Sequence, residues 1–98
     1  MNQFMVEVNL PESLSPELIS LIPSQREFID EMLHRGIITN YTLAMDRSKL
    51  WVTFEAQTVK EVRQVVDNFP IAEYIEYNIH QLAFSNSASA VLPEISLN

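Results

Sequence analysis

The chain has 98 residues, the length of one small domain, and its 13 acidic and 6 basic side chains give a net charge of −7. This charge repels a phosphate backbone and an anionic membrane surface, so we expect neither nucleic acid nor a membrane as a partner. The absence of cysteine excludes disulfides, thiolate nucleophiles and cysteine-based metal sites, and it fits a cytoplasmic protein. The N-terminal residues Met1–Leu10 contain Glu7 and Asn9 and no basic segment, so we expect no signal peptide.

The first predicted element is a strand over Gln3–Leu10. Apolar side chains occupy every second position, which places Phe4, Val6, Val8 and Leu10 on one face. Pro11 ends the strand. This alternation predicts a strand with one face packed on a core.

A helix follows, beginning at Ser15-Pro16-Glu17, where a hydroxyl cap precedes a proline and an acidic residue. Gly36 fits the position just past its end. Pro23 lies inside the apolar stripe of this helix, and we expect a kink or a restart there because an interior proline costs about 3 kcal/mol. Ser24 and Glu27 form a capping box that favours a restart.

The second half of the chain predicts three further strands and a second helix. Segments 37–45 and 49–55 are rich in β-branched and aromatic residues, which predicts a β-hairpin with Asp46-Arg47-Ser48 at its tip. Thr58 and Glu61 cap a helix that Pro70 closes, and segment 74–84 is a long extended run.

This order predicts a ferredoxin-like α+β fold, β-α-β-β-α-β, with a four-stranded antiparallel sheet and both helices on one face. Residues 1–84 form this domain. Residues 85–98 form a tail, and its apolar residues lead us to expect that it packs on the domain or on a neighbouring subunit. Because the strands carry enough Tyr, Trp, Met and Ile for both sheet faces to be apolar, we expect two sheets to face each other in a homodimer or a higher oligomer.

The sequence contains few candidates for chemistry. A single glycine excludes glycine-rich phosphate loops, and His34 and His80 lack metal-ligand spacing, so we expect no metal and no cofactor. Gln25 stands in the apolar stripe of the first helix, either bonded to backbone freed by Pro23 or aimed into a pocket. Tyr41 and Tyr74 are core rings or pocket walls, and Arg47 is solvated or reaches an anionic ligand or a neighbouring subunit.

Certain segments resemble the muconolactone δ-isomerase family, and the match runs almost without gaps from Phe4 to Phe84. The resemblance is carried by Asn9-Leu10-Pro11, by the helix ending at Gly36, and by Val52-Thr53-Phe54-Glu55. It is most specific in Phe69-Pro70-Ile71-Ala72-Glu73-Tyr74-Ile75, which is similar to the family's Leu-Pro-Leu-x-Pro-Tyr-Met signature. The resemblance implies a ferredoxin-like fold that assembles through paired sheets, as a dimeric α/β barrel, into a higher oligomer.

The active-site positions of that family differ in this chain. The resemblance places the family's helix glutamate, which moves the proton of the isomerisation, at Gln25. The arginine of its Leu-Trp-Arg strand motif falls on Leu43, and a hairpin histidine falls on Arg47. Glu27 lies about 200° further around the helix and does not simply replace the lost glutamate. No catalytic residue can therefore be assigned.

Three hypotheses follow. The first is a diverged, cofactor-independent isomerase-like protein that binds or isomerises a small organic acid or lactone, with a site formed by Gln25, Tyr41, Arg47 and Tyr74. This hypothesis predicts a partly polar pocket between helix and sheet. It fails if that space is filled by Phe28, Met32 and Trp51. The second is a non-catalytic oligomeric binding or assembly module of the same fold. The third is a haem or flavin monooxygenase of the related barrel type, which neither His34 nor His80 favours.

Overall fold

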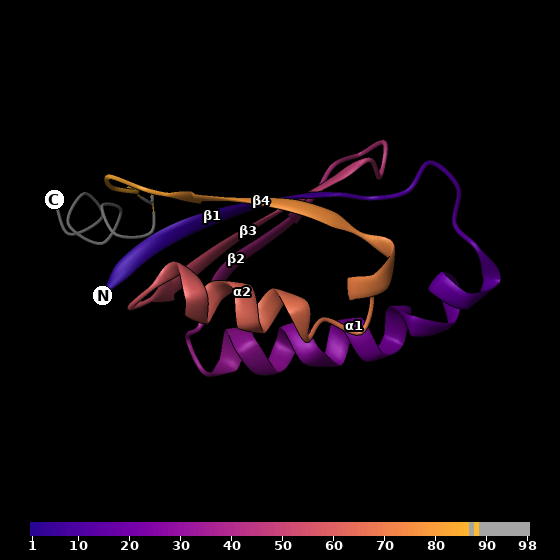
Figure 1. The fold of residues 1–98 in the computed structure, drawn as a ribbon, viewed down its shortest axis with the longest axis horizontal. Helices are drawn as coiled ribbons and strands as arrows, with labels where there is room; N and C mark the ends of the chain where they lie inside the picture. The colour runs from indigo at the N-terminus through magenta and orange to yellow at the C-terminus, as the bar shows by residue number, and fades with distance from the viewer. Residues whose placement is uncertain (87, 89–98) are drawn as a thin grey trace, which may run out of the picture.

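A computed structural model describes residues 1–86 and 88 of the chain. The elements follow in the order β1 (Asn2–Asn9), α1 (Pro16–His34), β2 (Ile38–Leu43), β3 (Lys49–Ala56), α2 (Val59–Asp67), the short 3-10 helix η1 (Ala72–Tyr74) and β4 (Glu76–Gln81). The described strands form one antiparallel sheet in the order β2-β3-β1-β4, and α1 and α2 lie side by side against one of its faces (Figure 1). The predicted ferredoxin-like α+β fold is confirmed.

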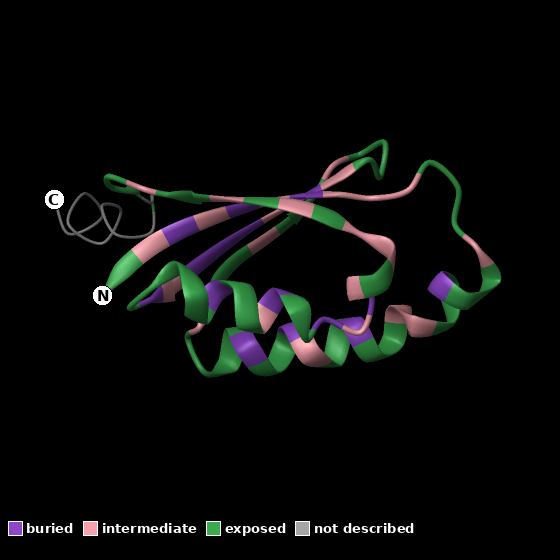
Figure 2. Ribbon diagram, in the orientation of Figure 1, coloured by how far each residue is buried: buried purple, intermediate pink, exposed green. Residues whose placement is uncertain are grey.

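The core lies between the helices and the two central strands. Alternate residues of β1 are buried, as its sequence pattern predicts, and Figure 2 shows the buried bands along this strand. Phe4 pairs with Phe54 and Val6 with Val52 across β1 and β3, and all four side chains are almost completely buried. This paired apolar surface is where the helices pack, and its burial is the main favourable contribution to folding.

Helix α1 is continuous across Pro23, so the predicted restart is wrong. Figure 1 shows the first turns of α1 at an angle to the rest of the helix, which is the bend expected of an internal proline. The buried stripe of Leu18, Gln25, Ile29 and Met32 keeps its phase past the proline. Packing along this stripe holds the helix together where Pro23 cannot donate a backbone hydrogen bond.

Both ends of α1 are capped as the sequence predicts. The Ser15 hydroxyl oxygen accepts a hydrogen bond from the backbone N–H of Leu18 at 3.1 Å. At the other end, Gly36 has a φ of 75° and its N–H donates to the Leu33 carbonyl at 3.1 Å. A left-handed backbone at this position is what glycine provides without strain.

The sheet face that carries no helix is mixed in character. The strand register places Met5, Glu7, Trp51, Thr53 and His80 on this face. The Glu7 carboxylate lies 3.2 Å from the Lys49 ammonium and 3.9 Å from the His80 imidazole. The expectation of an apolar second face is therefore wrong in part, since a small apolar centre is flanked by charged side chains.

The expectation that the tail over residues 85–98 packs on the domain or on a neighbour falls largely on residues 87 and 89–98, which lie outside the described residues. None of the helices in the described part of the chain combines the length and the apolar character needed to cross a bilayer.

Candidate functional site

A pocket of about 320 Å³ opens between the N-terminal half of α1 and the β2 side of the sheet. We call it the α1–β2 pocket. Its walls are mainly aliphatic, and its polar groups come from α1, β2 and the hairpin tip between β2 and β3. The lining residues are Leu10, Leu14, Leu18, Ile22, Gln25, Arg26, Tyr41, Leu43, Arg47, Leu50 and Ile71. A small cavity with apolar walls and few polar groups is typical of a site for a small organic ligand.

Gln25 lies at the buried end of this pocket, with a side chain only 5% exposed. Its Oε1 accepts a hydrogen bond from the backbone N–H of Ile71 at 3.4 Å. Its Nε2 is buried and has no hydrogen-bond partner among the described residues. Leaving a buried amide donor unpaired costs about 1–3 kcal/mol.

Tyr41 faces the same space from β2, where it pairs with Val52 of β3. Burial raises the pKa of the Tyr41 hydroxyl, and the nearby Gln25 amide partly offsets that rise. The amide is close enough to act on the hydroxyl, yet the two side chains do not have hydrogen-bonding geometry. Tyr41 therefore stays protonated at neutral pH and offers the pocket a neutral O–H donor.

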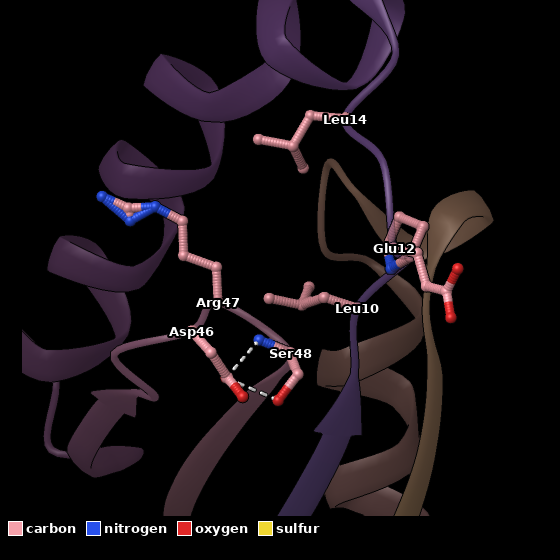
Figure 3. A pocket seen from close by; sticks show the side chains of 7 residues that line it. Leu10, Glu12, Leu14, Asp46, Arg47 and Ser48 are labelled. Carbon is pink, nitrogen blue, oxygen red and sulfur yellow. Dashed lines mark hydrogen bonds between the residues drawn. The ribbon is translucent and has the colours of Figure 1, made fainter.

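Two arginines line the more open part of the pocket. Arg26 follows Gln25 on α1, and Arg47 stands at the hairpin tip with a left-handed φ of 62°. Figure 3 shows the Arg47 side chain extending from the hairpin toward α1. Neither guanidinium forms a salt bridge with another described residue. A left-handed φ is uncommon outside glycine, and such conformations recur at functional sites.

A second hollow, of about 380 Å³, lies beside the first and shares Leu10, Leu14 and Arg47 with it. Its carboxylates are not available to the α1–β2 pocket. Asp46 Oδ1 accepts hydrogen bonds from the Ser48 backbone N–H at 3.0 Å and from the Ser48 hydroxyl at 2.7 Å, and these bonds lower the pKa of Asp46. Glu12 points away from the other lining side chains in Figure 3.

The structure brings three of the four sequence-predicted site residues together. Gln25, Tyr41 and Arg47 line the α1–β2 pocket, whereas Tyr74 is half-buried in η1 and does not line it. Leu43, which the sequence resemblance places at the family's strand arginine, lines the same pocket as Gln25 and Arg47. Glu27 is exposed on α1 and does not line it.

The space between helix and sheet is open rather than filled by large side chains. Phe28 packs edge-on against Phe69, with ring centroids 5.6 Å apart, and Met32 is buried further along α1. Trp51 lies on the opposite face of the sheet. The condition that would have excluded a ligand pocket is not met.

Sequence reasoning missed Arg26 and Ile71 as site residues. Arg26 is adjacent to Gln25 in the sequence, but whether it lines the pocket depends on the rotation of α1 about its own axis relative to the sheet. Ile71 contributes a backbone N–H from a segment 46 residues away from Gln25, and no local pattern signals that contact.

The residues that line the pocket hold and orient a ligand more readily than they move a proton. None of the lining side chains is a carboxylate or an imidazole. Within the described residues, no group of three His, Asp or Glu side chains could hold a metal ion. The polar lining consists of a neutral amide, a neutral hydroxyl and two guanidinium groups, all of them hydrogen-bond donors.

Tyr41→Phe should reduce the loss of stability at alkaline pH. The pKa of Tyr41 is higher in the folded chain than the unfolded value of 10.0, so the folded state keeps a proton that the unfolded state releases. Below pH 10.0 this group leaves stability unchanged, and from there upward the wild type should lose stability more steeply than the variant. Urea unfolding over a pH series measures this difference, and parallel curves would show that Tyr41 is as solvated as in the unfolded chain.

Solved structures of other proteins share this fold, and two of them are compared with this chain here. Muconolactone isomerase aligns with 16% sequence identity and a TM-score of 0.71, over 87% of this chain and 92% of that chain. The 5-chloro-2-hydroxyhydroquinone dehydrochlorinase from Burkholderia phenoliruptrix AC1100, in complex with 2,5-dihydroxybenzoquinone, aligns with 17% identity and a TM-score of 0.62, over 91% and 98%. No protein-family model matches the sequence, and a search of curated proteins finds no match. The resemblance noted in the sequence is confirmed at the level of architecture: this chain has the fold of muconolactone isomerase.

Proposed function

We propose that this chain is a diverged muconolactone isomerase-like protein that binds a small organic acid or lactone in the α1–β2 pocket. The observation that carries the proposal is the pair Arg26 and Arg47, which line an apolar pocket without a carboxylate partner among the described residues.

The placement of these arginines runs against the charge balance of the chain. Acidic side chains outnumber basic ones by 13 to 6, yet two of the six basic residues line this pocket and no acidic residue does. Two guanidinium groups on one cavity repel each other. A ligand carboxylate offsets that repulsion and can form paired hydrogen bonds with an arginine.

The shape and lining of the pocket favour a compact apolar body on the same ligand. Leu18, Ile22, Leu43 and Leu50 form much of the wall, and a volume of about 320 Å³ suits a ligand built on one ring. Burial of such a body contributes binding energy, while the arginines select for the acid group.

Binding without isomerisation follows from the side chains at the substituted positions. A glutamine does not ionise and cannot act as a general base, and Gln25 occupies the position of the family's proton-carrying glutamate. Leu43 and Arg47 line the same pocket, and they stand at the other two positions where this chain differs from the family's active-site residues. The chain retains a pocket there and has exchanged its acid–base group for a neutral amide.

A second candidate function is a non-catalytic assembly module in which the helix-free sheet faces of two copies meet. Half-buried Trp51 and Met5 near the centre of this face favour it. Light scattering of the wild type should then show a homodimer or a higher oligomer, and Trp51→Glu should shift it toward the monomer. A monomeric wild type would contradict this candidate and leave the pocket proposal standing.

Arg47→Met should weaken the binding of cyclohexanecarboxylate, a minimal one-ring acid, by roughly tenfold, because a charge-assisted hydrogen bond contributes about 1.5–3 kcal/mol and part of it is screened at this open position. Titration calorimetry measures the change. Arg35→Met is the matched control, since Arg35 is exposed past the end of α1 and does not line the pocket. Equal weakening by both variants would show that only net charge matters, and no weakening by Arg47→Met would contradict the proposed anion site.

Gln25→Glu should introduce turnover of muconolactone that the wild type lacks. A carboxylate at this position keeps an acceptor for the Ile71 N–H and adds a group that can carry a proton. General acid–base catalysis by such a group raises a reaction rate by a factor on the order of 10²–10⁴. A spectrophotometric assay of both proteins measures it. Comparable turnover by the wild type would show that another residue moves the proton, and the binding-only proposal would fall.

A further inference from the structure

The buried Gln25 amide presents its donor end to Tyr41. Its Oε1 is occupied by the Ile71 N–H at 3.4 Å, and its Nε2 is buried without a hydrogen-bond partner among the described residues. The Gln25 side chain also lowers the pKa of the Tyr41 hydroxyl and so offsets part of the effect of burial. A hydrogen-bond donor near a phenol oxygen stabilises the ionised form of the phenol, so the –NH2 end of the amide is the end that lies toward Tyr41.

Tyr41 is the member of this pair that can reach a ligand. It lines the α1–β2 pocket together with Arg47 and is half-buried, whereas Gln25 is only 5% exposed. With a donor on the Gln25 side of the hydroxyl oxygen, the O–H proton points away from Gln25. Gln25 is the one described side chain that acts on this hydroxyl besides the effect of burial. The proton is therefore free for an acceptor in the pocket.

We propose that Gln25 is a positioning residue, which holds the Tyr41 hydroxyl so that it donates its proton to the ligand carboxylate bound by Arg47. This inference rests on the proposed function, which supplies the acid and its arginines. Gln25 itself does not touch the ligand. In the free chain the amide and the hydroxyl lie close together without hydrogen-bonding geometry, and Nε2 is unpaired among the described residues. A carboxylate that accepts the Tyr41 proton makes the hydroxyl oxygen a better acceptor, so binding closes the contact with Nε2.

An amide suits this role better than the carboxylate that the sequence resemblance places at this position in the family. An ionised carboxylate has no proton to offer the Tyr41 oxygen. The amide can donate to Tyr41 while its oxygen keeps the bond from Ile71. The same side chain that cannot carry a proton therefore strengthens the hold on the acid through Tyr41.

A double-mutant cycle with cyclohexanecarboxylate tests this inference by titration calorimetry. We expect Tyr41→Phe to weaken binding roughly tenfold, because it removes a hydrogen bond to a charged group. Gln25→Met should weaken binding roughly threefold in the wild-type background and should have no effect in the Tyr41→Phe background, since the two side chains act as one unit. Gln64→Met, on the exposed side of α2, is the matched control and should leave the affinity unchanged.

A second measurement follows the Tyr41 hydroxyl directly, by NMR of ¹³C-labelled tyrosine rings over a pH series. Gln25→Met should raise the pKa of Tyr41 above its wild-type value, because it removes the group that lowers this pKa. An unchanged Tyr41 titration would show that Gln25 serves packing alone, and it would overturn the inference. If Gln25→Met does not fold, Gln25→Glu keeps an acceptor for Ile71 and removes the donor, so both measurements apply to it.

Two failures are distinguishable. If Tyr41→Phe binds the acid as tightly as the wild type while Arg47→Met weakens binding, the inference is overturned and the proposed function stands. Equal weakening by Gln25→Met in both backgrounds would also overturn the inference, because Gln25 would then act independently of Tyr41. If the wild type does not bind the acid, or if binding ignores Arg47, the proposed function fails and the inference fails with it.

Discussion

The hydrogen bond from the Ile71 backbone N–H to Gln25 Oε1 joins two parts of the chain on which the site depends. It links the middle of α1 to the segment that follows α2, across 46 residues. It occupies the acceptor end of the amide, while Nε2 is buried and has no partner within the described chain. Together with the edge-on contact of Phe28 and Phe69, this bond connects α1 to the segment that leads into η1.

The polar groups that line the pocket differ in burial. Gln25 is buried, whereas Arg26 and Arg47 are exposed, and aliphatic side chains form most of the remaining lining. This lining supports the proposal of a ligand that combines an apolar body with an acid group. The lining contains no carboxylate and no imidazole, and the Gln25 amide does not ionise.

Much of the fold could be predicted because its signals are local. Alternating apolar residues in β1 and the caps at Ser15 and Thr58 act over a few residues, and the structure has the corresponding elements. The restart at Pro23 was wrong because the local cost of a proline is offset by burial along the whole helix face. The helix-free face was read as more apolar than it is, since alternation alone does not tell which face the helices cover.

The candidate site was only partly accessible from the sequence. Gln25 could be singled out because a polar residue in an apolar helix stripe is conspicuous. Arg26 and the Ile71 backbone could not, because their positions depend on how α1 and the loop after α2 pack together. Tyr74 has the same ring and hydroxyl as Tyr41, yet only Tyr41 lines the pocket, since β2 directs it under α1 while η1 holds Tyr74 elsewhere.

The most direct test of the proposed anion site follows the arginine side chains by ¹⁵N–¹H NMR during a titration with cyclohexanecarboxylate. The proposal predicts that the side-chain resonances of Arg26 and Arg47 shift as the acid binds and that those of Arg35, which does not line the pocket, do not. Unchanged Arg47 resonances under conditions where calorimetry reports a bound acid would contradict it.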